Sequence, residues 1–331
     1  IYKFEVLAHQ SVIHFENTKT VTVPYNATNR LPVLYVSDDM KASASALEQS
    51  LLNSIADEKN QNMSAAQQML LQWHQKLNHV GYSHICWLAN QGFLGNRAKR
   101  VSSIVRDQFP LCATCLYGKQ ARRPDGTKES QALPEKIGAL KRDVEAPGDV
   151  TALDQYSHTT PGRGPSLTIS SSARFVGGTI FVDLSSGRIK VAHQTSLNTH
   201  ETLAAKVKYE QDALMHGVTV KRYHCDNGIF TARDFTRHVL ERGQGISYSG
   251  VGAKHQNGNA ERAIKTVTYM ARTMMLHAAI RWPEVYNPEL WPYALTYACH
   301  VYNTIPRPAT GMSANELFSG VKEDHISNLS N

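Results

Sequence analysis

The chain has 331 residues, enough for two domains of ordinary size or for one domain with appendages. With 41% hydrophobic and 19% charged residues it has a globular composition, and no apolar run reaches the roughly 18 residues of a membrane span. The 35 Lys and Arg against 28 Asp and Glu give a net charge of +7, which suits a polyanionic partner. Five cysteines, an odd number in so long a chain, argue against a disulfide scaffold and indicate a reducing, intracellular compartment.

The first 63 residues are predicted to form a leading β segment and a linker. Residues 1–38 alternate in short β-like runs separated by Asn, Pro and Thr, and 40–64 turn polar and rich in Ala and Gln. The chain begins at Ile1 rather than Met and lacks a signal-like start. We therefore expect a piece of a longer polyprotein that is not secreted.

A small helical domain is predicted over 64–120. Apolar residues recur at spacings of three and four in 64–79, where Ser64 is the expected cap, and a second helix fits 83–90 before Gly92. A basic stretch with Pro and Gly follows over 121–148 and forms the expected linker. The excess positive charge is concentrated near here, at Arg97, Lys99, Arg100, Arg106, Lys119, Arg122 and Arg123.

From residue 149 strand and helix patterns alternate. The expected strands are 149–156, 175–183, 188–194, 218–225 and 246–250, and the expected helices are 199–216, 231–242, 260–279 and 289–303. This order predicts an α/β domain over 149–320, with a mixed five-stranded sheet and flanking helices, and leaves 321–331 as a tail.

Two His and two Cys have the spacing of a metal site. Four residues separate His74 from His79, Cys112 and Cys115 form a C-x-x-C, and 32 residues lie between the two pairs. Two imidazoles and two thiolates make a closed tetrahedral zinc site in which each short pair chelates. His84 and Cys86 are rival ligands, and the alternative is that all four residues simply pack or face solvent. We expect structural Zn²⁺, since so small a core is insecure alone.

Three carboxylates stand at positions where strands and helices can bring them together. Asp154 follows apolar residues in an expected strand, Asp226 ends another, and Glu261 opens a helix with an apolar stripe. Like charges brought within a few ångströms repel, so only bound cations make such a cluster sensible. Hard oxygen ligands select Mg²⁺ or Mn²⁺, and a two-metal site serves phosphodiester displacement. Any one of these residues could equally be an ordinary surface charge.

Several segments together resemble the integrase of copia-type retrotransposons. The segments "WHQKLNH" and "CATCLYGKQARRP" look like its zinc-binding amino-terminal module, and "GDVTALDQY", "TIFVDLSSG", "YHCDNG" and "HQNGNAER" look like its core. The likeness continues through "TVTYMARTMML", "LWPYALTYACHVYNTIP" and "SANELFSG", and so covers about 64–320. It implies an RNase H-like core with a D,D,E triad at Asp154, Asp226 and Glu261, whereas Asp183 is not expected to be catalytic.

The chain departs from the family pattern at two points of its sequence and in its length. The retroviral pattern has 35 residues between the second and third carboxylates where this chain has 34, and Lys254 and His255 replace a Pro-containing approach. The family has a further carboxy-terminal region, for which this chain has little length, so complete integration by the chain alone is not expected. The first 60 or so residues would correspond to the linker before integrase in a Pol polyprotein.

The resemblance implies a DNA-joining enzyme that assembles as a homo-oligomer. Metals held by the triad would activate water to trim a DNA end, and the freed 3′-hydroxyl would attack target DNA. The partners would be double-stranded element ends and target DNA, in the nucleus, with no membrane. The expected DNA contacts are Asn257, Arg262 and Lys265 at the helix that Glu261 opens, Lys254 before it, and Lys119, Arg122 and Arg123. Lys265 could instead pair with Glu261.

Two other functions remain open at this point. A remnant of a retroelement could fold and bind nucleic acid without catalysis, although all three carboxylates are present. An RNase H-type nuclease would leave the His and Cys pairs unexplained and lacks an obvious fourth carboxylate.

Overall fold

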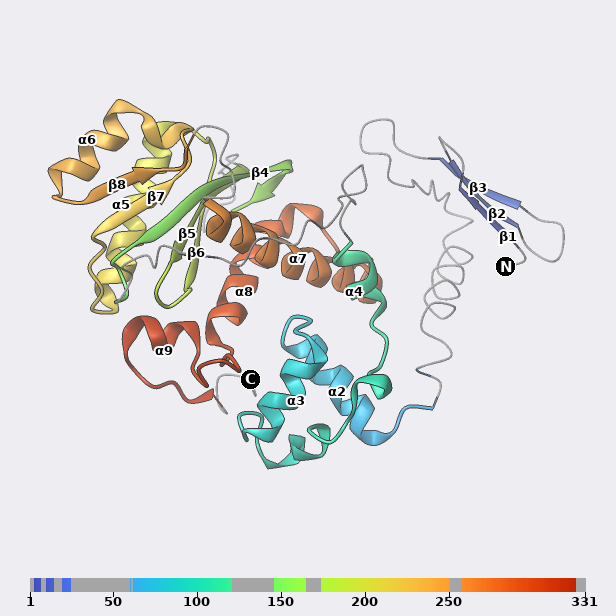
Figure 1. Ribbon diagram of the computed structural model, residues 1–331. Coiled ribbons are helices and arrows are strands. Elements are labelled where there is room, and N and C mark those ends of the chain that lie inside the picture. Colours follow the sequence, from blue (N-terminus) through green and yellow to red (C-terminus); the bar gives the residue numbers. More distant parts are fainter. Residues whose placement is uncertain are drawn as a thin grey trace, which may run out of the picture. The chain divides into compact units, whose positions relative to one another are not determined.

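The computed structural model describes residues 60, 62–120, 146–164, 174–250 and 257–325 with their side chains, and the backbone of three short strands near the amino terminus (Figure 1). The chain divides into two compact units, Ile1–Gln61 and Asn62–Asn331.

The first unit contains a three-stranded antiparallel sheet. Its strands pair in chain order and are β1 (Lys3–Val6), β2 (Gln10–His14) and β3 (Thr20–Pro24). The β-like alternation predicted a β segment here, which these strands confirm. The third expected run, "LPVLYVSDD", and most of the expected linker lie outside the described residues.

The second unit begins with a helical module. It consists of three α-helices and two 3₁₀ turns, α2 (Ala65–Lys76), α3 (Tyr82–Asn90), η2 (Asn96–Val101), η3 (Arg106–Gln108) and α4 (Ala113–Gly118). The apolar stripe of α2 meets that of α3, so that Leu70, Ile85 and Leu88 are fully buried. The two expected helices are therefore confirmed, and η2, η3 and α4 add three short turns.

Helix α2 starts where its sequence predicts and ends earlier. Ser64 forms a capping box with Gln67, because each side chain bonds the other's backbone N–H. The helix stops at Lys76 rather than at residue 79, since Asn78 and His79 take the left-handed conformation, with φ of 52° and 60°. This turn brings His79 close to the end of α2, where the backbone N–H of His79 donates to the carbonyl of His74.

A five-stranded mixed sheet forms the centre of the second unit, in the order β6-β5-β4-β7-β8 (Figure 1). Strands β6, β5 and β4 are antiparallel, whereas β7 and β8 run parallel to β4. Their bounds are β4 (Thr151–Arg163), β5 (Arg174–Asp183), β6 (Ile189–Gln194), β7 (Arg222–Cys225) and β8 (Gly245–Tyr248). The expected mixed sheet is confirmed, although β7 starts at Arg222 rather than at residue 218 and β4 continues past a register shift to Arg163.

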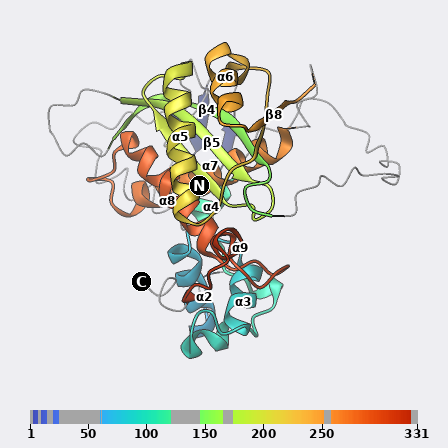
Figure 2. The ribbon, with the colours of Figure 1, turned by 90° about the vertical axis from the view of Figure 1, so that its left-hand side faces the viewer.

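Helices cover both faces of this sheet, because successive side chains of a strand point to opposite faces. Ala152 packs in the same cluster as residues of α7 (Gly258–Arg281) and α8 (Trp291–Thr304). Its neighbour Leu153 packs with residues of α5 (Thr199–Met215) and α6 (Arg233–Glu241) on the other face. Figure 2 shows α5 crossing in front of β4 and β5. The four expected long helices are thus confirmed to within two residues at each end.

The described residues of the second unit include three shorter helical elements, η4 (Ile229–Thr231), η6 (Pro288–Leu290) and α9 (Ala314–Ser319). Within the described part of the chain, no helix is long and apolar enough to cross a membrane.

Candidate functional site

Two of the three candidate carboxylates lie at matching positions on adjacent parallel strands. The register pairs Thr151 with Tyr223 and Ala152 with His224. Asp154 and Asp226 each stand two residues beyond the second of these pairs, where β7 has just ended. Because parallel strands keep their alignment, the two aspartates lie side by side at this edge of the sheet and on the face that α7 covers. The N–H of Gly228 donates to Asp226 and orients its carboxylate.

The third carboxylate, that of Glu261, lies near the start of α7, which a hydrogen bond from Asn257 joins to β4. The side-chain amide of Asn257, which is only 2% exposed, donates to the carbonyl of Leu153, the residue before Asp154. Glu261 follows on the first turn of α7 and is exposed. Buried residues on the opposite side, among them Ala263 and Val267, hold the helix against the sheet. The first residues of β4 and the start of α7 are therefore fixed to one another.

The pKa of Asp154 reflects its burial and the charges of the other two carboxylates. Burial raises the pKa of Asp154 to about 6, and the negative charges of Asp226 and Glu261 add to the rise, while the N–H of Gln155 opposes it. Among the described residues only the His and Cys group discussed below has its ligand atoms gathered tightly enough to hold a metal. Asp154, Asp226 and Glu261 thus influence one another by charge, but their oxygens are not gathered as tightly as the ligand atoms of that group.

The raised pKa predicts how the metal-free protein titrates. Because the folded chain holds the Asp154 proton more tightly than the unfolded chain, the free energy of unfolding should fall as the pH rises from about 4, the ordinary value, through 6. NMR of ¹³C-labelled aspartate should find Asp154 titrating near pH 6. In the Asp226→Asn/Glu261→Gln variant its pKa should drop part of the way towards the ordinary value, since burial remains. An unchanged pKa would place the other two carboxylates too far away to act together.

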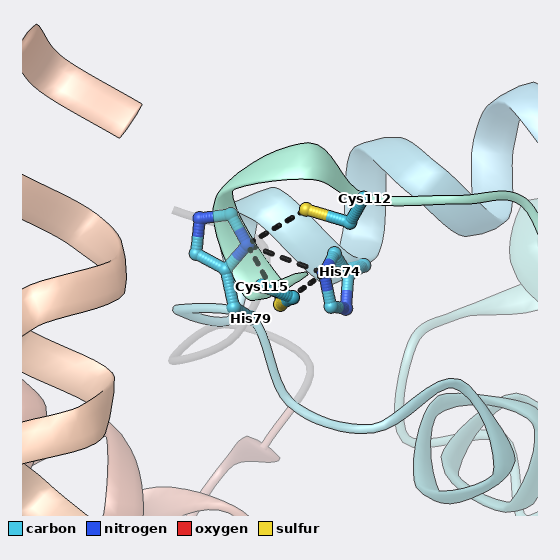
Figure 3. Close-up of side chains that lie close together, drawn as sticks. All are labelled: His74, His79, Cys112 and Cys115. Atoms are coloured by element: carbon cyan, nitrogen blue, oxygen red, sulfur yellow. Dashed lines mark hydrogen bonds between the residues drawn. The ribbon is translucent and has the colours of Figure 1, made fainter. Parts of the chain in front are cut away.

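The four residues of the predicted zinc site converge in the helical module (Figure 3). His74 Nε2 lies 3.2 Å from His79 Nδ1 and 3.2 Å from Cys115 Sγ. His79 Nδ1 lies 3.4 Å from Cys112 Sγ and 3.6 Å from Cys115 Sγ. In tetrahedral zinc coordination such atoms are roughly 3.3 to 3.8 Å apart, given bonds of about 2.05 Å to nitrogen and 2.3 Å to sulfur. The donor atoms therefore fit Zn²⁺ in both type and spacing.

The protonation of the site also suits a cation. The pKa of the Cys112 thiol is lowered because Cys115, and then the two histidines, hydrogen-bond to its sulfur, and this thiolate raises the pKa of Cys115. Burial lowers the pKa of His79 and keeps its imidazole neutral. With Cys112 as a thiolate and His79 neutral, the thiol proton of Cys115 is the one that Zn²⁺ would displace.

The rival ligands point elsewhere. His84 Nε2 contacts the carbonyl of Pro306 at 2.7 Å, and the Cys86 thiol faces the carbonyl of Ile104. Asp183 is likewise engaged, since its fully buried carboxylate accepts bonds from Gly148 and Ser186. The sulfur of Cys86, the ring of His84 and the carboxylate of Asp183 are thus accounted for without a metal.

The expected DNA contacts fare differently. The side chain of Asn257 is buried and donates to the carbonyl of Leu153, so its expected contact with DNA stays a prediction. Lys265 is exposed with its ammonium 5.6 Å from the centre of the Tyr269 ring, and no ion pair joins it to Glu261 although both residues are described. The guanidinium of Arg262 bonds Asn259 and the carbonyl of Gly258 at the start of its own helix.

The remaining basic residues divide into described and undescribed ones. Lys119 is exposed, but its ammonium donates to the carbonyl of His79 at 2.7 Å and so supports the zinc site. Arg97, Lys99, Arg100 and Arg106 are exposed on η2 and η3. Lys254, Arg122 and Arg123 lie outside the described residues.

Two contacts that support these sites are not predicted from the sequence. His277 on α7 contacts His79, with 3.2 Å between His277 Nδ1 and His79 Nε2, across 198 positions of the chain. The sequence predicts a DNA contact for Asn257, whereas its side chain donates to the carbonyl of Leu153 in β4. Neither role has a local signal, because each depends on a contact between distant segments.

Comparisons with known proteins give a likeness of fold at low identity. No family model matches this chain. A chain of the simian T-cell lymphotropic virus intasome in complex with the PP2A regulatory subunit B56 gamma matches with a TM-score of 0.42 and 14% identity, over 55% of this chain and 57% of that chain. Two structures of the HTLV-2 integrase catalytic core domain in complex with magnesium, in trimeric and dimeric form, match with TM-scores of 0.37 and 16% identity. They cover 52% and 53% of this chain and 97% and 99% of their own. Identities this low describe a fold and not an activity.

Proposed function

We propose that this chain is an integrase of the copia type, a metal-dependent polynucleotidyl transferase that trims DNA ends and joins them to target DNA. The observation that supports the proposal is the register of β4 and β7, which aligns Asp154 with Asp226, together with the effect of the Asp226 and Glu261 charges on the pKa of Asp154. The copia assignment rests on the sequence motifs, from "WHQKLNH" to "SANELFSG".

In this proposal Asp154, Asp226 and Glu261 hold divalent cations. Their carboxylate oxygens are the hard ligands that Mg²⁺ and Mn²⁺ prefer, and the strain of their like charges is the strain that a cation would relieve. Bound in pairs, such cations activate the attacking oxygen and stabilise the leaving one. The fold would position these carboxylates, because β4 and β7 hold the two aspartates and Asn257 holds the start of the helix that bears Glu261.

DNA would approach across the first turns of α7. Lys265 stands four residues after Glu261, hence on the same side of the helix, and its ammonium is exposed. Arg262 is exposed beside it, whereas the buried side chain of Asn257 would hold the start of the helix in place. Further phosphate contacts would come from the basic residues before the core, Arg97, Lys99, Arg100, Arg106, Lys119, Arg122 and Arg123, and from Lys254.

The proposal also includes a structural zinc ion, DNA partners and a homo-oligomer. Zn²⁺ held by His74, His79, Cys112 and Cys115 would be structural, since four protein ligands close the coordination sphere. The partners would be element ends and target DNA, with the chain acting as a homo-oligomer in the nucleus.

One assay separates this function from its rivals. The chain is incubated with Mg²⁺ and labelled DNA ends, and with a branched DNA that mimics the joined product and tests the reverse exchange. We expect joined or resolved products that disappear in Asp226→Asn and persist in Asp234→Asn, which alters an exposed aspartate on α6. Binding without products would favour a catalytically silent nucleic-acid-binding remnant, and cleavage of RNA in a hybrid would favour a nuclease.

A further inference from the structure

The two histidine ligands of the candidate zinc site have different kinds of outer partner. The Nδ1 atom of His74 lies 2.7 Å from the carbonyl of Val80, six residues away. The Nε2 atom of His79 lies 3.2 Å from Nδ1 of His277, near the end of α7. One ligand is therefore oriented within the helical module, and the other is oriented by the α/β core.

The positions of the ring nitrogens imply one arrangement of protons when the site holds a cation. His79 turns Nδ1 towards His74 and the two sulfurs, so its remaining proton is on Nε2 when Nδ1 binds a cation. That Nε2–H has Nδ1 of His277 as its acceptor, which requires His277 to carry its own proton on Nε2. The ring of His277 in turn stacks on Trp282, with an angle of 12° between the planes.

The same stretch of α7 receives the helix that bears Cys115. Gly118, the last residue of α4, lies so close to Thr273 that an added Cβ would be 2.3 Å from its Oγ1 and 2.8 Å from its Cα. Arg272 donates to the carbonyl of Gly118, at the end of α4, and to that of Gln120 just beyond it. Since His277 lies one turn after Thr273, both ends of this contact are on one side of α7.

We propose that His277 is the positioning residue of zinc ligand His79, and that the zinc site thereby orders the second half of α7. Helix α7 then carries Glu261 near its start and a support of the zinc site about 24 Å further along, given 1.5 Å per residue. Outer partners that orient a metal-binding histidine strengthen metal affinity about 10- to 100-fold. The inference rests on the zinc site and not on DNA joining.

The test measures zinc affinity of the full chain by competition with a chromophoric chelator. His277→Phe keeps a ring against Trp282 but removes the acceptor, and should weaken zinc binding about 10- to 100-fold. His277→Asn places Oδ1 near the position of Nδ1 and should stay within a few-fold of wild type. Thr268→Ala, at an exposed position on the same helix, should change nothing.

Hydrogen–deuterium exchange supplies the second measurement. Zinc should slow amide exchange over residues 268–281 in the wild-type chain and much less in His277→Phe. Wild-type affinity in His277→Phe, or equal losses in the Phe and Asn variants, would overturn the role of His277 while leaving the zinc site intact. A wild-type chain that binds no zinc would overturn both, whatever its activity on DNA.

Discussion

Replacing Glu261 by glutamine should abolish Mg²⁺-dependent DNA joining and at the same time raise the melting temperature of the metal-free chain. The activity should fall at least about a thousand-fold, because a metal supplies several kcal/mol of transition-state stabilisation and each 1.36 kcal/mol is tenfold in rate. The stability should rise because the charge of Glu261 is one of those that make ionisation of Asp154 unfavourable. DNA binding should persist, since the variant removes a negative charge facing phosphate.

The measurements are joining of labelled DNA ends, thermal unfolding in EDTA and DNA affinity at several salt concentrations. Glu241→Gln is the matched control, an exposed glutamate on α6 away from the carboxylates, and it should leave the joining rate unchanged. If Glu261→Gln joined DNA at the wild-type rate, the three carboxylates would not form a catalytic set.

Replacing Cys112 by serine should unfold the helical module. Structural zinc contributes on the order of 10 kcal/mol, more than a core built from α2, α3 and a few turns can supply alone. The variant should lose its zinc, and amide protection over α2 and α4 should fall, whereas β4 and β5 should stay protected. Metal analysis and hydrogen–deuterium exchange measure both effects.

Cys86→Ser is the control for this prediction, because the Cys86 sulfur faces the carbonyl of Ile104 rather than the ligand group. It should retain one zinc per chain and wild-type exchange. Zinc retained by Cys112→Ser, together with unchanged protection of α2, would show that the module folds without the metal.

The elements that sequence predicts best are those whose pattern is local. Helix α7 was expected from an apolar stripe, and Val267 and Ala271 are indeed buried against the core. The sheet was expected from alternation and from short buried runs. Strand β7 begins at Arg222 rather than at the expected residue 218. Val218 and Val220 are buried but do not pair in the sheet, and hydrophobicity alone does not separate a buried residue from one in a strand.

The two candidate sites differ in the same way. The zinc ligands form two short pairs, and each pair carries its own spacing signal, so the sequence identifies all four. The carboxylates stand alone in the sequence, and their proximity depends on the parallel pairing of β4 with β7 and on Asn257. Asn257 and Arg262 look like polar surface residues in "HQNGNAER", and only the fold separates the buried amide from the exposed guanidinium.

The close contact between Gly118 and Thr273 restricts which sequences can pack the helical module against α7 in this way. Part of the crowding is against the main chain of residue 273, so trimming Thr273 would not make room for a side chain at 118. Among homologues that seat the module on α7 in this way, we expect position 118 to stay glycine while 273 remains free to drift among small residues. In a homologue with a bulkier residue at 118, the helical module would have to move away from α7. The residue that corresponds to His277 would then no longer contact the zinc ligand that corresponds to His79.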